Sequence, residues 1–142
     1  MTAALVSVTD LVKRYEGGGA WRRRRPVFAL NGVSFTIGAG ETLGLVGESG
    51  SGKSTLGRVV VRLAAASSGS VRYAGEEILG LEGKALRKLR RSIQMIFQDP
   101  YSSLNPRLRA GAAVAEGLEI HRLLPSREIP ARVEQLFEEV GL

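Results

Sequence analysis

The sequence lacks cysteine and long apolar runs, and both absences exclude classes of protein. With 0 cysteines, the 142-residue chain has neither a disulfide scaffold nor a cysteine-ligated zinc or iron–sulfur site. No apolar run approaches the roughly 18 residues that a membrane-spanning helix needs, and the first ten residues do not resemble a secretory signal. Apolar residues make up 44% and charged residues 24%, which predicts a folded globular chain rather than a disordered one.

Positive charge exceeds negative charge, but most of the excess lies in two short runs. The chain has 20 basic and 14 acidic residues, a net charge of +6. Four consecutive arginines occupy positions 22–25, and five further cations lie between Lys84 and Arg91. We interpret these runs as a solvated loop and a solvated helix face. A basic balance also raises an anionic membrane surface as an alternative partner.

A nucleic-acid-binding module is a competing hypothesis for the same two basic runs. It predicts binding to DNA or RNA that weakens steeply with salt. Only Trp21 offers an aromatic side chain beside these charges for stacking on a base. We therefore expect no nucleic acid partner.

Hydrophobic periodicity and turn residues predict an alternation of short strands and helices. Glycine is abundant, with 18 residues, and it marks most of the expected turns. The expected strands cover 4–11, 27–37 (interrupted by a turn at Asn31-Gly32), 42–46, 70–74 and 92–97. The expected helices cover 53–63, 82–91, 109–121 and 130–140.

One motif predicts a phosphate-binding site. Residues 47–54, GESGSGKS, fit the pattern G-x-x-x-x-G-K-[ST], between an expected strand and an expected helix. Its glycines permit backbone angles that let successive N–H groups point at phosphate oxygens, and the helix N-terminus adds further donors. Lys53 is expected to reach the β- and γ-phosphates, and the Ser54 hydroxyl to bind Mg²⁺. A guanine-specifying N-K-x-D motif is absent, which disfavours a GTPase.

A nucleotide site of this kind also needs a group that holds Mg²⁺ or orients the attacking water. Three interpretations fit the end of the expected strand 92–97. Gln98 contacts Mg²⁺ or the water near the γ-phosphate, or Asp99 is the metal carboxylate, or 98–100 is a plain turn. We favour Gln98. The Asp99 interpretation would make the chain a different P-loop enzyme, such as a kinase or a nucleotide-dependent switch.

Two segments, GETLGLVGESGSGKSTLGRVVVRL and MIFQDPYSSLNPR, resemble the ATP-binding subunit of an ABC transporter. The similarity is closest to the oligopeptide/dipeptide and nickel importer group, and it covers about residues 5–142. It implies an α/β fold: a P-loop NTPase with an N-terminal antiparallel β subdomain and a partial parallel core sheet, truncated before the signature motif. The implied parts are 1–41, which includes the basic loop 17–25, then a P-loop core over 42–100 and the start of a helical subdomain over 101–142.

The resemblance also implies roles for individual residues. Tyr15 matches the aromatic residue that stacks on adenine, and Gln98 matches the glutamine that couples the γ-phosphate site to the membrane subunits. Lys53 and Gln98 are then the catalytic candidates, and Ser54 and Gln98 the Mg²⁺ ligands. The phosphate-loop residues of ATP binding are Gly47, Glu48, Ser49, Gly50, Ser51, Gly52, Lys53, Ser54 and Thr55.

The resemblance further implies partners and a location. The segment from Gln98 to Arg107 is expected to contact transmembrane permease subunits, and a second ATP-binding subunit, identical or related, is expected to complete a dimer. The subunit would lie peripherally on the cytoplasmic face of the inner membrane. Peptides are the favoured solutes, while nickel and other small solutes stay open.

Three motifs of that family are missing from these 142 residues: an LSGGQ-type signature, an apolar strand ending in Asp-Glu, and a switch histidine. His121, the single histidine, lies upstream of where the signature would fall. We therefore expect the N-terminal half of a longer subunit, arising as a truncated gene product, an engineered fragment or an incomplete reading frame. Little or no ATP turnover is expected from this chain alone, which leaves open whether it is itself an enzyme; a non-catalytic ATP-binding remnant is the alternative.

Overall fold

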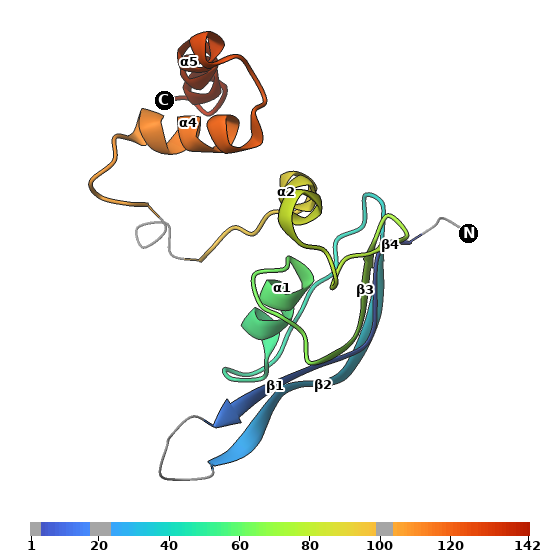
Figure 1. The fold of residues 1–142 in the computed structure, drawn as a ribbon. Helices are drawn as coiled ribbons and strands as arrows, with labels where there is room; N and C mark the ends of the chain where they lie inside the picture. The colour runs from blue at the N-terminus through green and yellow to red at the C-terminus, as the bar shows by residue number, and fades with distance from the viewer. Residues whose placement is uncertain (1–3, 18–23, 99–103) are drawn as a thin grey trace. The chain divides into compact units, whose positions relative to one another are not determined.

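A computed structural model describes residues 4–17, 24–98 and 104–142, which fall into two compact units (Figure 1). The first unit, Met1–Met95, contains the strands β1 (Ala4–Gly17), β2 (Arg24–Gly38), β3 (Ser68–Tyr73) and β4 (Glu76–Glu77) and the helices α1 (Lys53–Val60) and α2 (Gly83–Ser92). The second unit, Ile96–Leu142, contains α4 (Ala110–His121), the short 3₁₀ helix η1 (Ser126–Glu128) and α5 (Ile129–Glu139).

The first unit is built on an antiparallel sheet with the strand order β2-β1-β3-β4. This sheet confirms the expected antiparallel β subdomain. The β3–β4 hairpin closes through Ala74 and Gly75, whose φ angles are 48° and 83°. Two positive φ angles in a two-residue loop match the right-handed twist of the flanking strands, which explains the tight reversal.

The turn expected at Asn31-Gly32 is a bulge within one long strand. Leu11 of β1 pairs with Val33 of β2, and Lys13 pairs with Leu30, so β2 carries one residue more than β1 over this interval. Gly32 has a φ of 73° and accommodates the extra residue. The dipeptide therefore bends β2 without ending it, and the prediction of a turn there is wrong.

The core of the first unit lies between the sheet and its two helices. Leu56 and Val59 of α1 and Leu89 of α2 are buried against the sheet residues. The remaining buried members are Val8, Leu11, Leu30, Val71 and Ile78. Leu63, expected on the apolar face of α1, is 50% exposed, because α1 ends at Val60 and the chain turns at Arg62, whose φ is 60°.

The strands expected at 42–46 and 92–97 do not form, and this part of the prediction is wrong. Neither segment has a ladder partner among the described residues, and Val46 and Ile96 are 94% and 97% exposed. A short apolar run indicates a buried segment, but a parallel strand exists only where a neighbour accepts its hydrogen bonds. The described residues consequently contain the antiparallel sheet and no parallel one.

The second unit is a helical hairpin of α4 and α5. Ile129 and Val133 of α5 are buried, and Pro130 lies in the first turn of α5, where its missing N–H costs nothing. Beyond α5, Gly141 has a φ of 78° and donates its N–H to the carbonyl of Glu138. The two helices expected here are confirmed to within one residue at each end. None of the described helices has the length and apolar character needed to cross a membrane.

Candidate phosphate-binding site

The glycine-rich loop leads directly into α1. Gly50 and Gly52 have φ angles of 83° and 96°, in the left-handed region that favours glycine. Gly52 is the N-cap of α1; no side chain caps the helix, and its first turn contains no acidic residue. The first N–H groups of the helix therefore have no side-chain acceptor, and together with the helix dipole they favour an anion at this end.

Gly52 also brings the loop against the sheet. A Cβ atom at this position would lie 2.3 Å from the carbonyl oxygen of Ala29, in β2. No side chain fits this gap, so glycine permits the loop and β2 to touch. The sheet thereby supports the loop from one side, and the bond from the Leu56 N–H to the Gly52 carbonyl, 2.8 Å long, anchors it to α1.

The Lys53 ammonium lies across the loop. Its Nζ atom donates to the carbonyl oxygens of Gly47 and Glu48, both at 2.6 Å, and to Ser51 Oγ at 3.3 Å. The side chain thus fixes the start of the loop and concentrates positive charge beside it. A phosphate oxygen at this ammonium would form a charge-assisted hydrogen bond, which is stronger than a bond to a neutral carbonyl.

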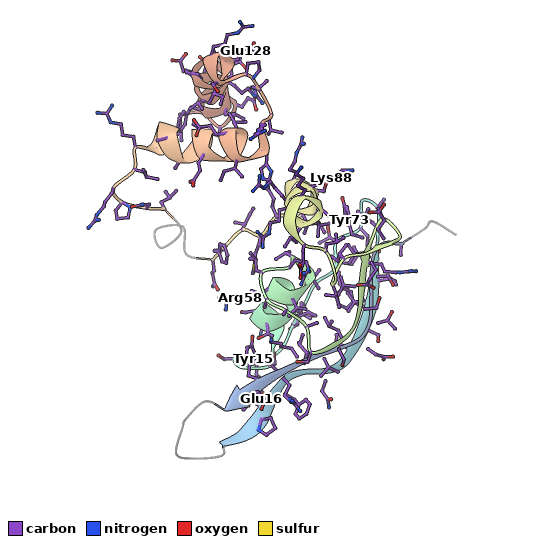
Figure 2. All side chains as sticks on the ribbon, viewed as in Figure 1. Tyr15, Glu16, Arg58, Tyr73, Lys88 and Glu128 are labelled. Atoms are coloured by element: carbon purple, nitrogen blue, oxygen red, sulfur yellow. The ribbon has the colours of Figure 1, made fainter. Side chains whose placement is uncertain are left out.

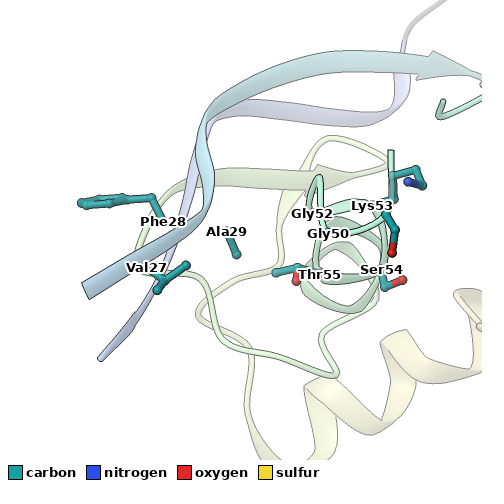
Figure 3. A pocket seen from close by; sticks show the side chains of 9 residues that line it. Val27, Phe28, Ala29, Gly50, Gly52, Lys53, Ser54 and Thr55 are labelled. Atoms are coloured by element: carbon teal, nitrogen blue, oxygen red, sulfur yellow. The ribbon is translucent and has the colours of Figure 1, made fainter. Parts of the chain in front are cut away.

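A cavity of about 520 Å³ opens beside the loop and the start of α1. Its walls combine loop and helix residues with three residues of β2: Val27, Phe28, Ala29, Ser49, Gly50, Gly52, Lys53, Ser54 and Thr55. Figure 3 shows Val27 and Ala29 on the same side of β2 and Phe28 on the other. The cavity has a polar end at the loop and an apolar end at β2, which suits a ligand with a phosphate group and a flat apolar part.

The structure places six of the nine expected phosphate-loop residues in this wall: Ser49, Gly50, Gly52, Lys53, Ser54 and Thr55. The other three, Gly47, Glu48 and Ser51, hold Lys53 instead. The three β2 residues were missed from the sequence, because only the contact between Gly52 and Ala29 brings β2 to the loop. The motif contains no signal for that contact.

Tyr15 lies beside the cavity and does not line it. It pairs with Val27 across the β1–β2 ladder, is 45% exposed, and has Lys13 Nζ 4.8 Å from its ring centre. Directly paired residues share one face of a sheet, so Tyr15 and Val27 are neighbours on the same face. The adenine-stacking role of Tyr15 stays a prediction.

The expected metal site rests on few protein atoms. Among the described residues, no group of three or more histidine, aspartate or glutamate side chains could hold a metal ion. Ser54 lines the cavity and offers one hard oxygen ligand of the type Mg²⁺ prefers, with phosphate oxygens of a nucleotide supplying others. Gln98 belongs to the second unit, and its role at this site stays a prediction. Asp99 lies outside the described residues.

Comparisons with known proteins show which sequences this chain resembles. Residues 30–142 match the family model described as "ABC transporter". The chain is 45% identical, over 97% of its length, to the di/tripeptide transport ATP-binding protein DppF of Pseudomonas aeruginosa. It is 47% identical, again over 97% of its length, to the glutathione import ATP-binding protein GsiA of Escherichia coli K12. The chain spans 43% of the first relative and 22% of the second.

Solved structures show the same fold. A post-hydrolysis dimer of the ATP-binding cassette MJ0796, bound to ADP and Pi, matches with a TM-score of 0.77 at 26% identity, covering 96% of this chain and 57% of that one. The cbiO1 protein of Clostridium perfringens, part of the ABC transporter complex cbiONQ, matches with a TM-score of 0.70 at 28% identity, covering 98% and 51%. With the family model covering most of the sequence, the chain belongs to the ABC transporter family.

Proposed function

We propose that this chain is the nucleotide-binding part of an ABC importer subunit that couples ATP binding and hydrolysis to the uptake of peptides or similar small solutes. The observation that carries the proposal is the cavity formed by the loop, the uncapped start of α1 and β2, with Lys53 held inside the loop. The names of the relatives, a di/tripeptide transporter and a glutathione importer, support the solute class.

The proposed roles follow the chemistry of the wall. Loop N–H groups and Lys53 bind the β- and γ-phosphates, while Ser54 contributes a ligand to Mg²⁺. The sheet face that carries Val27 and Tyr15 receives the base. Gln98 couples the γ-phosphate to the permease subunits, which contact the segment from Gln98 to Arg107. A second ATP-binding subunit faces this one at the cytoplasmic side of the inner membrane.

Titration calorimetry with MgATP tests nucleotide binding. Lys53→Ala removes the ammonium from the loop and is expected to weaken binding by at least tenfold, since hydrogen bonds to charged groups contribute about 1.5–3 kcal/mol. Lys84→Ala, which removes an exposed lysine from α2, is the matched control and should bind like the parent chain.

The same samples also test turnover, which we expect to be absent because the signature, the Asp-Glu pair and the switch histidine are missing from these residues. Equal ATP affinity in the Lys53 and Lys84 variants would contradict the proposed site. Phosphate release by the parent chain that is lost in Lys53→Ala would contradict the proposed lack of turnover.

A further inference from the structure

Helix α2 carries a stripe of positive charge on the side opposite its buried face. Lys84, Arg87, Lys88 and Arg91 occupy positions i, i+3, i+4 and i+7 of the helix, and all four are exposed. At 100° per residue they fall within a sector of about 100°. The stripe runs for about 10 Å along the helix, at 1.5 Å per residue. We call these four residues the α2 stripe.

The inner side of α2 fixes the direction in which the stripe points. Leu89 is buried in the core of the first unit, and Leu86 and Ile93 pack against that core. Around the helix axis, the mean direction of these three residues is opposite to that of the α2 stripe. The fifth cation, Arg90, lies beside the apolar side and donates to the carbonyl oxygen of Arg62 at 3.4 Å. Docking of α2 on the sheet therefore turns the stripe outward; Figure 2 shows α2 with Lys88 labelled.

The α2 stripe is not neutralised within the part of the chain that the structure describes. Helix α2 contains no acidic residue, and the described salt bridges are Arg14–Glu16, Arg127–Glu128 and Arg132–Glu139. Glu76 lines a cavity of about 250 Å³ together with Lys88, yet no ion pair joins them. An anionic partner would consequently meet four cations without displacing an internal carboxylate.

Helix stability alone does not explain this arrangement. Like charges three and four residues apart repel each other, and Lys84 lies in the first turn, where the helix dipole favours negative charge. Features that oppose local stability are expected where the sequence serves binding. The helix also contains no aromatic residue, whereas single-stranded nucleic acid sites combine charge with aromatic stacking. A flat anionic surface fits a straight stripe of cations better.

We propose that the α2 stripe binds the anionic phospholipid headgroups of the membrane on which the transporter operates. The proposal rests on the proposed function, since a peripheral importer subunit works beside such a surface. Each Lys or Arg near an anionic membrane strengthens attachment by roughly fivefold at low salt. Four cations on one helix face would therefore add weak, salt-sensitive attachment to the contacts with the permease.

Vesicle co-sedimentation of the 142-residue chain tests the proposal without any variant. The chain should bind vesicles made of equal parts phosphatidylglycerol and phosphatidylcholine, bind pure phosphatidylcholine at least tenfold less, and detach at about 1 M salt, where the Debye length is ~3 Å. Equal binding to both kinds of vesicle would overturn the proposal. Binding to duplex or single-stranded DNA in preference to the anionic vesicles would overturn it in favour of a nucleic acid partner.

A pair of variants then locates the binding surface. One replaces Lys84, Arg87, Lys88 and Arg91 with glutamine, which preserves helix propensity; the other replaces the four arginines 22–25 with glutamine and has the same net charge. The first should lose roughly several hundredfold in vesicle partitioning and the second less than about tenfold. Equal losses, or a larger loss in the second, would overturn the assignment to α2.

Nucleotide binding separates the two proposals. The α2 stripe variant should keep the ATP affinity and circular dichroism of the parent chain, and Lys53→Ala should keep its vesicle binding. If the parent chain binds anionic vesicles but not ATP, the result counts against the proposed function only. If the parent chain binds ATP but not anionic vesicles, the result counts against the proposed lipid-binding surface only.

Discussion

At the scale of single residues, Gly52 connects the phosphate loop to the rest of the molecule. Its left-handed φ of 96° and the 2.3 Å approach of the Ala29 carbonyl to a built Cβ leave room for no other residue. From the sequence motif, the glycine at this position is explained by phosphate binding alone. The contact with β2 adds a structural reason that only the folded chain reveals.

We expect Gly52→Ala to destabilise the first unit and to abolish nucleotide binding. A non-glycine residue in a sparsely populated backbone region costs of order 1–3 kcal/mol, and the overlap with Ala29 adds to that cost. Gly57→Ala, inside α1, is the matched control, because a Cβ atom there would lie at an ordinary 3.6 Å from the Met95 side chain. This substitution should stabilise the folded state by about 0.5–1 kcal/mol. Urea unfolding followed by circular dichroism measures the stability of both variants. Equal stabilities of Gly52→Ala and Gly57→Ala would contradict the account.

A second residue, Glu77, ties stability to pH. Burial raises the pKa of its carboxyl, but the hydrogen bond from the Ser70 hydroxyl and those from the N–H groups of Leu79, Val71 and Ile78 outweigh burial and lower the pKa below its ordinary value of 4.5. The carboxylate thus stabilises the folded state fully above pH 4.5, and the contribution is lost as the pH falls through the lowered pKa.

The Glu77→Gln variant should therefore be less stable than the parent chain at neutral pH, and the difference should shrink as the pH falls below 4.5. Unfolding by urea at a series of pH values measures it. Glu76→Gln removes the same charge from the neighbouring exposed residue, whose side chain makes none of the described hydrogen bonds. If both variants follow the same pH profile relative to the parent chain, the hydrogen-bonded carboxylate of Glu77 is not the cause.

At the scale of elements, hydrophobic periodicity predicted the helices, because a helix depends mainly on local sequence. The helices at 53–63, 82–91, 109–121 and 130–140 were all found, because each carries apolar residues at helical spacing or a helix-ending signal. The end of α1 was placed too late, since Leu63 continues the apolar pattern after the backbone has turned at Arg62.

Strands were predicted less well, because a strand depends on its neighbour. The β1–β2 ladder is longer than the apolar runs that indicated it, since it also includes the charged residues Lys13 and Arg14, which pair with Leu30 and Phe28 of β2. The runs 42–46 and 92–97 look like strands but have no partner in the described residues. Val27 and Ala29 were missed for the same reason, because their place in the site depends on a contact between distant segments. The phosphate loop could be predicted because its residues are consecutive in the sequence.

The docking of α2 provides a prediction at this scale. Leu89→Ala should cost about 2–5 kcal/mol of unfolding free energy, as is usual for truncating a buried leucine, and should speed amide exchange in α2. Leu63→Ala makes the same chemical change at a half-exposed position after α1 and should cost less than about 1 kcal/mol. Comparable costs at the two positions would show that α2 is not held through Leu89.

At the scale of the whole molecule, the chain shares its fold with ATP-binding cassettes while spanning little more than half of the matched cassette structures. The sequence predicted the family from two motif segments, and the family model and the solved structures confirm it. The proposed chemistry depends on one cavity in the first unit. The central claim is that a nucleotide occupies this cavity, with its phosphates at the loop and its base at β2.

Amide chemical-shift mapping with MgATP tests that claim most directly. The account predicts shifts concentrated in residues 47–55 and at Val27, Phe28 and Ala29, and it predicts that the Lys53→Ala variant needs at least tenfold more MgATP to reach the same shifts. Shifts confined to other surfaces, such as the α2 stripe, or shifts that persist unchanged in Lys53→Ala, would contradict it.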